Sequence, residues 1–180
     1  DVMTRMTQVF VEFGHVLKKM AVPKFAVLLI VMGSGYVNGF ILWAVSMILM
    51  LVLGIELSIW VLLIPLVLVI VTILAGGLGA IAALLHVFAR DIGHILPVVL
   101  QLAFWVTPIV YTRDMVPDSF QWIMDHHPLA PLIQLFQDMI AYGLPPSLST
   151  VILYSGLCCA LWLAFWVLFK NAISEVMDAL

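Results

Sequence analysis

The 180-residue chain is dominated by apolar residues: 65% of its residues are hydrophobic, only 9% are charged, and the formal net charge at pH 7 is -3. Soluble globular domains carry about 25% charged residues, so the composition excludes a soluble domain and predicts an all-α integral membrane protein. The small net charge says nothing about partners, because in a membrane protein the placement of Lys and Arg carries the information. No nucleic-acid partner is expected.

Residues 1–24 mix polar and apolar types. Residues 2–13 resemble the cytoplasmic end of an earlier helix, and the polar stretch from Asp1 to Gln8 is unlike a cleavable signal peptide. The stretch HVLKKMAVP then sets apolar residues at helical spacing beside two lysines and ends at a proline: Val16, Leu17, Met20, Lys18, Lys19 and Pro23. Two interpretations stay open, an interfacial helix on anionic lipid and a helix that docks into a groove on a cytoplasmic partner.

Four apolar stretches are long enough to be candidate membrane spans, since about 20 helical residues cross a bilayer. They cover residues 25–53, 59–85, 95–111 and 148–169. The third is marginal at 17 residues. A tight hairpin, GIELS, joins the first two spans, the long segment 112–147 joins the last two, and residues 170–180 form a tail.

The distribution of Lys and Arg predicts the orientation. If the amino-terminal segment is cytoplasmic and all four stretches cross, six of the seven Lys and Arg residues lie inside: Arg5, Lys18, Lys19, Lys24, Arg90 and Lys170. Arg113 alone falls outside, which agrees with the positive-inside rule. A third run that failed to cross would move Lys170 outside, so four crossings with both ends of the chain cytoplasmic are expected.

Small residues indicate where the helices pack. Gly35 and Gly39 are four apart, as are Ala75 with Gly79 and Gly76 with Ala80, a spacing that lets helix backbones approach closely in lipid. The string GLGAIA also fits a loose dinucleotide-binding pattern, but no strand precedes it and it lies deep in an apolar span. The adjacent Cys158 and Cys159 are interpreted as small packing residues and not as a disulfide or metal site.

The four predicted spans contain no Asp, Glu, Lys or Arg. Proton- and sodium-coupled transporters place ionisable groups inside the membrane, so this pattern argues against secondary transport. The chain also lacks a phosphate-binding glycine loop with its lysine. It is therefore not expected to be an enzyme, and any energy for work must come from a partner.

Segment 112–147 predicts two short amphipathic helices broken at HHPLAP, either re-entrant or lying in the outer interface. Their apolar residues recur at helical spacing: Phe120, Ile123 and Met124, then Leu132, Ile133, Phe136, Met139 and Ile140. His126 and His127 point about 100° apart on a helix and have no ligand cluster beside them, so no metal site is expected. His15, His86 and His94 are interpreted as cytoplasmic-face residues.

Several motifs in one order are similar to a known family: LKKMAVPKF, the short hairpin, FARDIGHILPVVLQLAFWVTPIVY, HHPLAPLIQLFQDMI, and a tail ending VMDAL. Together they resemble the permease subunit of a type 2 ABC exporter, above all the subgroup that exports lipid-linked polysaccharides such as O-antigen, capsule and teichoic acid. The resemblance implies a bacterial inner-membrane protein, a homodimer and a separate ATPase pair that binds ATP and Mg²⁺, with no cofactor in this chain. Such permeases have an amino-terminal interface helix and six spans, so that helix, the first span and most of the second are expected to be absent here.

The resemblance also assigns roles by position. Residues His15 to Pro23 match the coupling helix that contacts the nucleotide-binding subunit. Residues 95–111 match the fifth span, which lines the translocation path, and residues 115–142 match the paired outer helices that close it. The chain departs from the family at His127-Pro128, where relatives usually have Asn-Pro, and at Gln137, where they often have arginine. The outer-gate candidates are Trp122, His127, Pro128 and Phe136.

A stripe on the third span is the candidate path, because it gathers two helix-breaking prolines, an amide and aromatic rings at three- and four-residue steps. Its members are Pro97, Gln101, Phe104, Trp105, Pro108 and Tyr111. Hydrocarbon cannot satisfy the freed carbonyls or the amide, so the stripe should face protein or water. It either packs against another helix or lines a conduit between two copies. Two other functions stay open, a non-transporting membrane anchor or assembly subunit and an exporter of lipid or drug.

Overall fold

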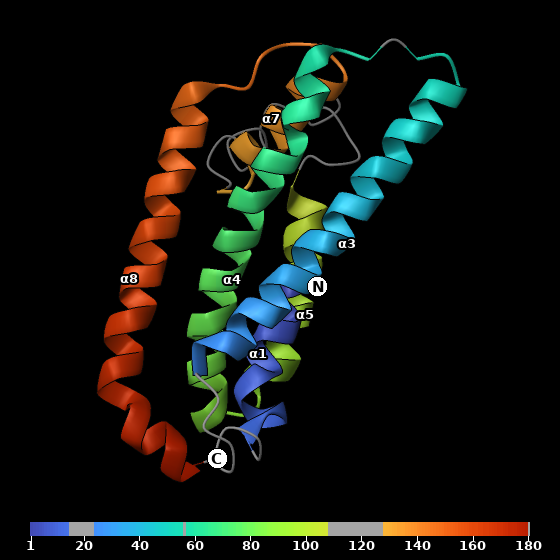
Figure 1. Cartoon of the computed structure of the whole chain (residues 1–180). Coiled ribbons are helices and arrows are strands. Elements are labelled where there is room, and N and C mark those ends of the chain that lie inside the picture. The colour runs from blue at the N-terminus through green and yellow to red at the C-terminus, as the bar shows by residue number, and fades with distance from the viewer. Residues whose placement is uncertain (15–23, 56, 108–127, 180) are drawn as a thin grey trace.

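The computed structural model describes residues 1–14, 24–55, 57–107 and 128–179, with the backbone alone for residue 24 and residues 173–179. Within these ranges every regular element is a helix (Figure 1). The elements are α1 (Val2–Glu12), α3 (Lys24–Val52), the short 3₁₀ helix η1 (Ile59–Leu63), α4 (Ile64–Phe88), α5 (Ile92–Val106), α7 (Ala130–Ile140) and α8 (Leu148–Ala179). The all-α class predicted from composition is confirmed for the part of the chain described here.

Three of the described helices are long and apolar enough to cross a membrane: Phe25–Val52, Ile59–Phe88 and Leu148–Ala172. They agree with the first, second and last predicted spans. Helix α5 has 15 residues, which makes it about 22 Å long at 1.5 Å per residue. That is less than the roughly 30 Å of a hydrocarbon core. A fourth crossing therefore stays a prediction.

The hairpin between the first two spans is built by local chemistry. Helix α3 ends in a Schellman motif, in which the Ile55 N–H donates to the Met50 carbonyl oxygen at 3.0 Å. Gly54 has a φ of +70°, a left-handed conformation that side chains disfavour. Ser58 then caps η1, and its hydroxyl oxygen accepts the Trp60 N–H at 3.4 Å. The sequence GIELS thus reverses the chain as predicted; Glu56 lies outside the described residues.

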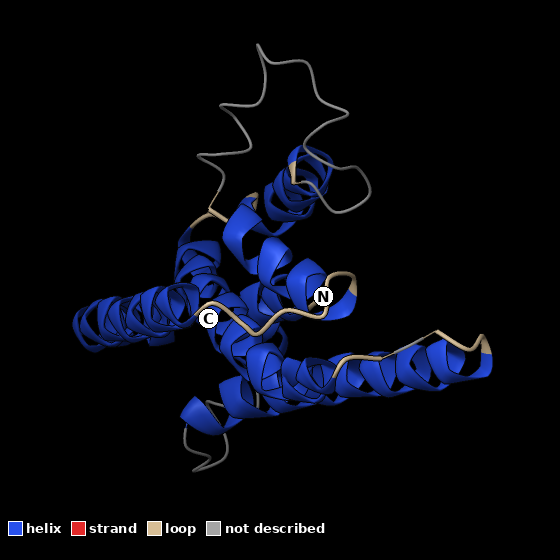
Figure 2. Ribbon diagram, turned by 90° about the horizontal axis from the view of Figure 1, so that it is seen from above, coloured by secondary structure: helices blue, strands red, loops and turns tan. Residues whose placement is uncertain are grey.

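Helix α4 is the centre of the fold, and α1, α3 and α8 pack against it. Seen from above, α3 and α8 splay to opposite sides of this centre (Figure 2). The largest buried cluster joins α1, α3, α4 and α8 near one end of the bundle: Met6, Val9, Phe10, Val27, Leu28, Val31, Ala80, Ala83, Leu84, Phe165 and Phe169. The outward faces of α3 and α8 stay rich in exposed leucine, isoleucine and valine, which suits helices whose solvent is lipid.

The predicted close packing at small residues is confirmed. A Cβ atom on Gly79 would lie 2.7 Å from Met6 Cβ and 3.1 Å from the Met3 carbonyl oxygen, so only glycine admits α1 to this distance from α4. Gly76 receives Met32 of α3, whose Sδ would be 2.8 Å from an added Cβ. Gly35 is likewise covered by the Val2 side chain. The glycine-rich stretch of α4 is therefore a helix-packing surface.

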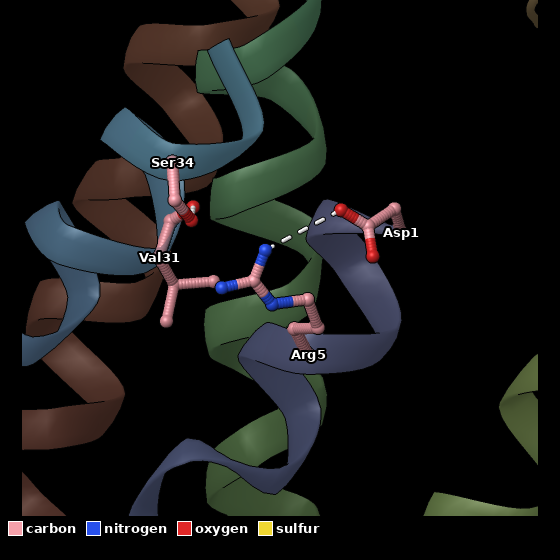
Figure 3. A network of polar contacts seen from close by, with 4 residues as sticks. All are labelled: Asp1, Arg5, Val31 and Ser34. Atoms are coloured by element: carbon pink, nitrogen blue, oxygen red, sulfur yellow. Dashed lines mark hydrogen bonds and ion pairs between the residues drawn. The ribbon is translucent and has the colours of Figure 1, made fainter. Parts of the chain in front are cut away.

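The start of α1 lies beside α3 (Figure 3). Arg5 and Asp1 form an ion pair at 3.5 Å, with both side chains well exposed. An exposed pair of this kind contributes about 0–1 kcal/mol. The contact between α1 and the bundle therefore depends on its buried apolar residues, Met6, Val9 and Phe10.

Helix α8 differs from the expectation in two respects. It continues to Ala179, beyond the predicted end of the span at Phe169, so the expected tail extends the same helix. Cys158 is buried as predicted, but Cys159 is exposed. Adjacent helical residues point about 100° apart, so only one of the two can face α4.

Candidate functional site

Helix α5, the candidate path helix, is anchored by its first turn. It follows the corner Ala89–Asp91 and contacts α1 and α4. Gly93 is its buried residue, and the Gly93 N–H donates to Nδ1 of His86 at 3.1 Å. His86 is 8% exposed. Its ring is therefore buried between the end of α4 and the start of α5. The interpretation of His86 as a cytoplasmic-face residue stays a prediction.

Beyond its first turn, α5 has one largely exposed face. Trp105 is 67% exposed and Phe104 is 45% exposed. Their ring centroids lie 5.9 Å apart with the planes at 81°, an edge-to-face pair. Gln101 is also exposed. The structure thus brings three candidate path residues together on an open surface of the chain.

The two prolines of the stripe act differently. Pro97 lies inside α5, and the helix runs through it from Ile92 to Val106. The expectation of a helix break at Pro97 is therefore wrong. Helix α5 ends at Val106, and the following residue, Thr107, has a ψ of 133°, the extended conformation favoured before a proline. Pro108 and Tyr111 lie outside the described residues.

Helix α7 lies in the half of the bundle that holds η1. Leu135 and Met139 are buried with Val61, Ile64 and Val67 near the start of α4. Leu132, earlier in α7, is buried with Leu74, which is ten residues and so about 15 Å further along α4 than Ile64. The amino-terminal end of α7 therefore packs further along α4 than its carboxy-terminal end. Whether α7 is re-entrant or interfacial stays a prediction.

Side chains of the spans hold both ends of α7. At its start, the Tyr154 hydroxyl of α8 donates to the Pro128 carbonyl oxygen. At its end, the Ser58 hydroxyl donates to the Gly143 carbonyl oxygen at 3.3 Å. Phe136 is partly buried against the Val61–Met139 cluster. Two of the predicted gate residues, Pro128 and Phe136, are thus in contact with the spans.

A polar pocket of about 260 Å³ lies at the opposite end of the bundle, where α1, α4 and α5 meet. Its lining residues are Gln8, Val11, Glu12, His86, Gly93 and His94. The larger grooves, of about 550 and 290 Å³, lie along α8 and are almost wholly apolar. Within the described chain, no group of three or more His, Cys, Asp or Glu residues has the arrangement of a metal site.

The remaining predicted site residues cannot be placed. The whole coupling segment, from His15 through Val16, Leu17, Lys18, Lys19 and Met20 to Pro23, lies outside the described residues, as do Trp122, His126 and His127. Their roles stay predictions.

Sequence reasoning missed the polar contacts between helices. Besides His86, they include the Tyr154, Cys158 and Trp162 side chains, which donate to backbone carbonyls on other segments. The indole N–H of Trp43 is buried and, in the described chain, has no hydrogen-bond partner. A sequence signal did exist for Tyr154 and Trp162: with Cys158 they recur every four residues and mark the inner face of α8.

Comparison with known proteins gives concordant matches. The family model described as ABC-2 type transporter matches residues 2–142. An O-antigen export system permease protein RfbA from Klebsiella pneumoniae is 36% identical over 84 residues, which covers 47% of this chain and 32% of that protein. A second RfbA protein from the same species is 32% identical over 80 residues, 44% of this chain and 31% of that protein.

The aligned part of the chain thus spans about a third of the length of the curated relatives it matches. The family model extends from the first turn of α1 past the end of α7 and takes in α3, α4 and α5. Because this match covers most of the sequence, the chain belongs to the ABC-2 type transporter family.

Proposed function

We propose that this chain is the membrane part of a permease that exports lipid-linked polysaccharide of the O-antigen, capsule or teichoic acid type. It acts in the bacterial inner membrane as a dimer, and a separate ATPase pair hydrolyses ATP with Mg²⁺. The family match and the two RfbA relatives, which are named as O-antigen export permeases, support this proposal.

The exposed stripe on α5 is the observation that carries the proposal. Gln101 is exposed on a helix that is otherwise almost wholly apolar. A carboxamide without partners costs several kcal/mol in pure hydrocarbon, on the order of 4–8 kcal/mol by transfer to cyclohexane, so this face is suited to water or to a second copy. The neighbouring rings of Phe104 and Trp105 offer flat apolar surfaces to sugars and demand no fixed hydrogen-bond pattern. Such a surface suits a polymer that must slide.

The two ends of the bundle take different roles in this proposal. Helix α7 dips in at the η1 end, where it closes the path on the outer side. Helix α1 leads into segment 15–23 at the other end, where the segment docks on the ATPase. In this orientation both ends of the chain are cytoplasmic, and the Lys and Arg distribution supports it.

Export by the purified system tests the proposal. The complete permease and its ATPase are reconstituted in lipid vesicles, and ATP turnover and glycolipid translocation are measured. A Phe104→Ala, Trp105→Ala double variant should lower translocation about tenfold, since aromatic contacts contribute about 0.5–1.5 kcal/mol each. Basal ATP hydrolysis should persist, and Gln101→Leu should have a smaller effect.

A matched control is the Phe40→Ala, Trp60→Ala double variant, which removes two exposed rings elsewhere on the chain. It should translocate glycolipid at the normal rate. Normal translocation by the Phe104→Ala, Trp105→Ala variant at equal abundance would remove α5 from the path. A wild-type system that moves phospholipid or drug but no glycolipid would instead establish a different cargo.

A further inference from the structure

His86 and Gly93 join α4 to α5 across the corner that separates them. The Gly93 N–H donates to Nδ1 of His86 at 3.1 Å and also to the Arg90 carbonyl oxygen at 3.3 Å. This one N–H therefore has two acceptors, one in the turn and one on the imidazole. An accepting Nδ1 carries no proton, so the neutral ring carries its proton on Nε2. The bond thus requires a neutral His86.

The contact is steric as well as polar. A Cβ atom on Gly93 would lie 2.6 Å from His86 Cε1 and 3.2 Å from Nδ1. The imidazole therefore lies directly on the α5 backbone, in a position that only glycine leaves free. One buried ring sets both the distance and the direction between the last turn of α4 and the first turn of α5.

This corner lies beside the end of α1. Gln8, Val11 and Glu12 of α1 line the same pocket as His86 and Gly93. Helix α1 ends at Glu12, and the chain then enters segment 15–23, the predicted coupling segment. The corner therefore lies beside the end of α1, which leads along the chain to the segment expected to meet the ATPase, and at the start of the helix expected to line the path.

Beyond its first turn, α5 has one open face and one half-buried face, and the first turn sets the direction in which the helix leaves the corner. Gly93 is its buried residue, whereas Ile95, Val98, Val99 and Leu102 are all exposed. A helix of 15 residues is about 22 Å long, so a tilt of about 10° at its start moves its far end by about 4 Å. A change at the corner is thus amplified at Phe104 and Trp105.

We infer that His86 is a positioning residue for the path helix: by accepting the Gly93 N–H it fixes the angle at which α5 leaves α4. This role rests on the proposed function of α5. It differs from the roles of the path and coupling residues, because His86 touches neither cargo nor ATPase and acts through Gly93.

Two matched substitutions of His86 separate the hydrogen bond from the packing. In His86→Asn, Oδ1 occupies the same covalent position as Nδ1 and can accept the Gly93 N–H. In His86→Leu, a side chain of nearly the same shape as asparagine has no acceptor. The complete permease with its ATPase is used for all three proteins, and the first measurement is hydrogen exchange of the Gly93 amide. His86 is seven residues away, so neither substitution changes the intrinsic exchange rate of this amide.

We expect His86→Leu to speed exchange of the Gly93 amide about fivefold, the loss that a typical hydrogen bond implies, whereas His86→Asn stays near wild type. The second measurement is glycolipid translocated per ATP hydrolysed. This ratio should fall at least about threefold in His86→Leu and recover in His86→Asn. If the ring had only a structural role, both substitutions would lower the abundance of the protein, and His86→Asn would not differ from His86→Leu in amide exchange or in glycolipid translocated per ATP.

Each outcome decides a separate point. Equal exchange in His86→Leu and wild type would show that the bond does not protect Gly93 and would overturn the inference. If His86→Leu speeds exchange of the Gly93 amide but leaves the glycolipid translocated per ATP unchanged, the bond exists but does not position α5. The same conclusion follows if His86→Asn restores protection of the Gly93 amide without restoring the glycolipid translocated per ATP. If the wild-type protein translocates no glycolipid, the proposed function fails, and the exchange measurement still tests the bond.

Discussion

The indole N–H of Trp162 on α8 donates to the Ile73 carbonyl oxygen on α4 at 3.0 Å, between two helices that meet mostly through apolar side chains. One turn earlier, Cys158 Sγ lies 3.6 Å from the Ile70 carbonyl oxygen. Gly77 completes this seam, because a Cβ atom there would lie 3.2 Å from Leu161 Cβ. A polar contact of this kind fixes the register of the two helices, which apolar packing alone specifies weakly.

Replacing Trp162 by Phe removes this donor and keeps an aromatic ring in the seam. We expect the free energy of unfolding to fall by about 0.6–1.7 kcal/mol, the range measured for hydrogen bonds between membrane helices. Thermal unfolding in detergent measures the change. Trp166→Phe is the control, since Trp166 is half exposed and contacts Phe25 through its ring. Equal effects of the two substitutions would show that the indole bond contributes nothing.

Gly79→Ala tests the close approach of α1 to α4. The added methyl group would meet Met6 Cβ and the Met3 carbonyl oxygen, and neither is the end of a flexible side chain. We expect a loss of about 1–3 kcal/mol, as for other overpacked sites. Gly156→Ala on α8 is the matched control, because nothing lies within 4 Å of the added atom. It should leave the midpoint of thermal unfolding unchanged or slightly higher. A neutral Gly79→Ala would mean that α1 is loosely attached.

The long helices could be predicted from the sequence because lipid imposes a simple rule: an apolar stretch must satisfy its own backbone, and only a helix does so. The hairpin at Gly54 was predictable for a related reason, since a glycine between two such stretches marks a helix end. Length also identified 95–111 as marginal, and the described helix α5 is indeed short.

The contacts between helices were not predictable to the same degree. In a protein surrounded by water, an amphipathic pattern shows which face of a helix is buried. A helix surrounded by lipid is apolar on every face, so the hydrophobic pattern does not show which face packs against other helices. In the amphipathic α7, Leu135 was overlooked for a different reason: it was left out of the apolar face, although it lies at helical spacing between Leu132 and Met139 and is almost fully buried. His86 was overlooked because its partner is a backbone N–H of Gly93, and a sequence contains no signal for a backbone group.

Cysteine labelling tests the orientation. On a background with Cys158 and Cys159 replaced, Lys18→Cys, Arg90→Cys and Lys170→Cys should react only after the membrane is permeabilised. The native cysteines are removed so that each labelled thiol is the introduced one. Glu56→Cys should react from outside in intact cells and serves as the positive control. Labelling of position 18 from outside would overturn the orientation.

The coupling segment is tested by placing a negative charge on its apolar face. Leu17→Asp or Met20→Asp should reduce ATP-dependent export about tenfold or more, since a buried unpaired carboxylate destroys docking in a groove. The protein should remain inserted, and basal ATP hydrolysis should continue. The measurement compares export with recovery of the ATPase in a pull-down. Normal export with the ATPase still bound would leave residues 15–23 as an interfacial helix on lipid.

The last prediction concerns the bond that holds the start of α7. Tyr154→Phe removes the hydroxyl donor to the Pro128 carbonyl oxygen but keeps the ring that packs with Leu74 and Leu132. Because the freed carbonyl lies at the end of α7 that packs further along α4, the proposed outer closure should loosen more than the fold. We expect a small loss of stability, about 0.5–1.5 kcal/mol, and a faster leak of a trapped dye from vesicles that hold the resting transporter.

Tyr36→Phe is the control for this variant, because the described part of the chain shows a ring contact with Phe40 but no hydrogen bond from the Tyr36 hydroxyl. It should match wild type in both stability and leak. If Tyr154→Phe lowers stability without any added leak, the bond serves the packing of α8 against α7. Helix α7 would then lie beside the path without closing it, and the gate would have to be sought elsewhere in residues 108–127.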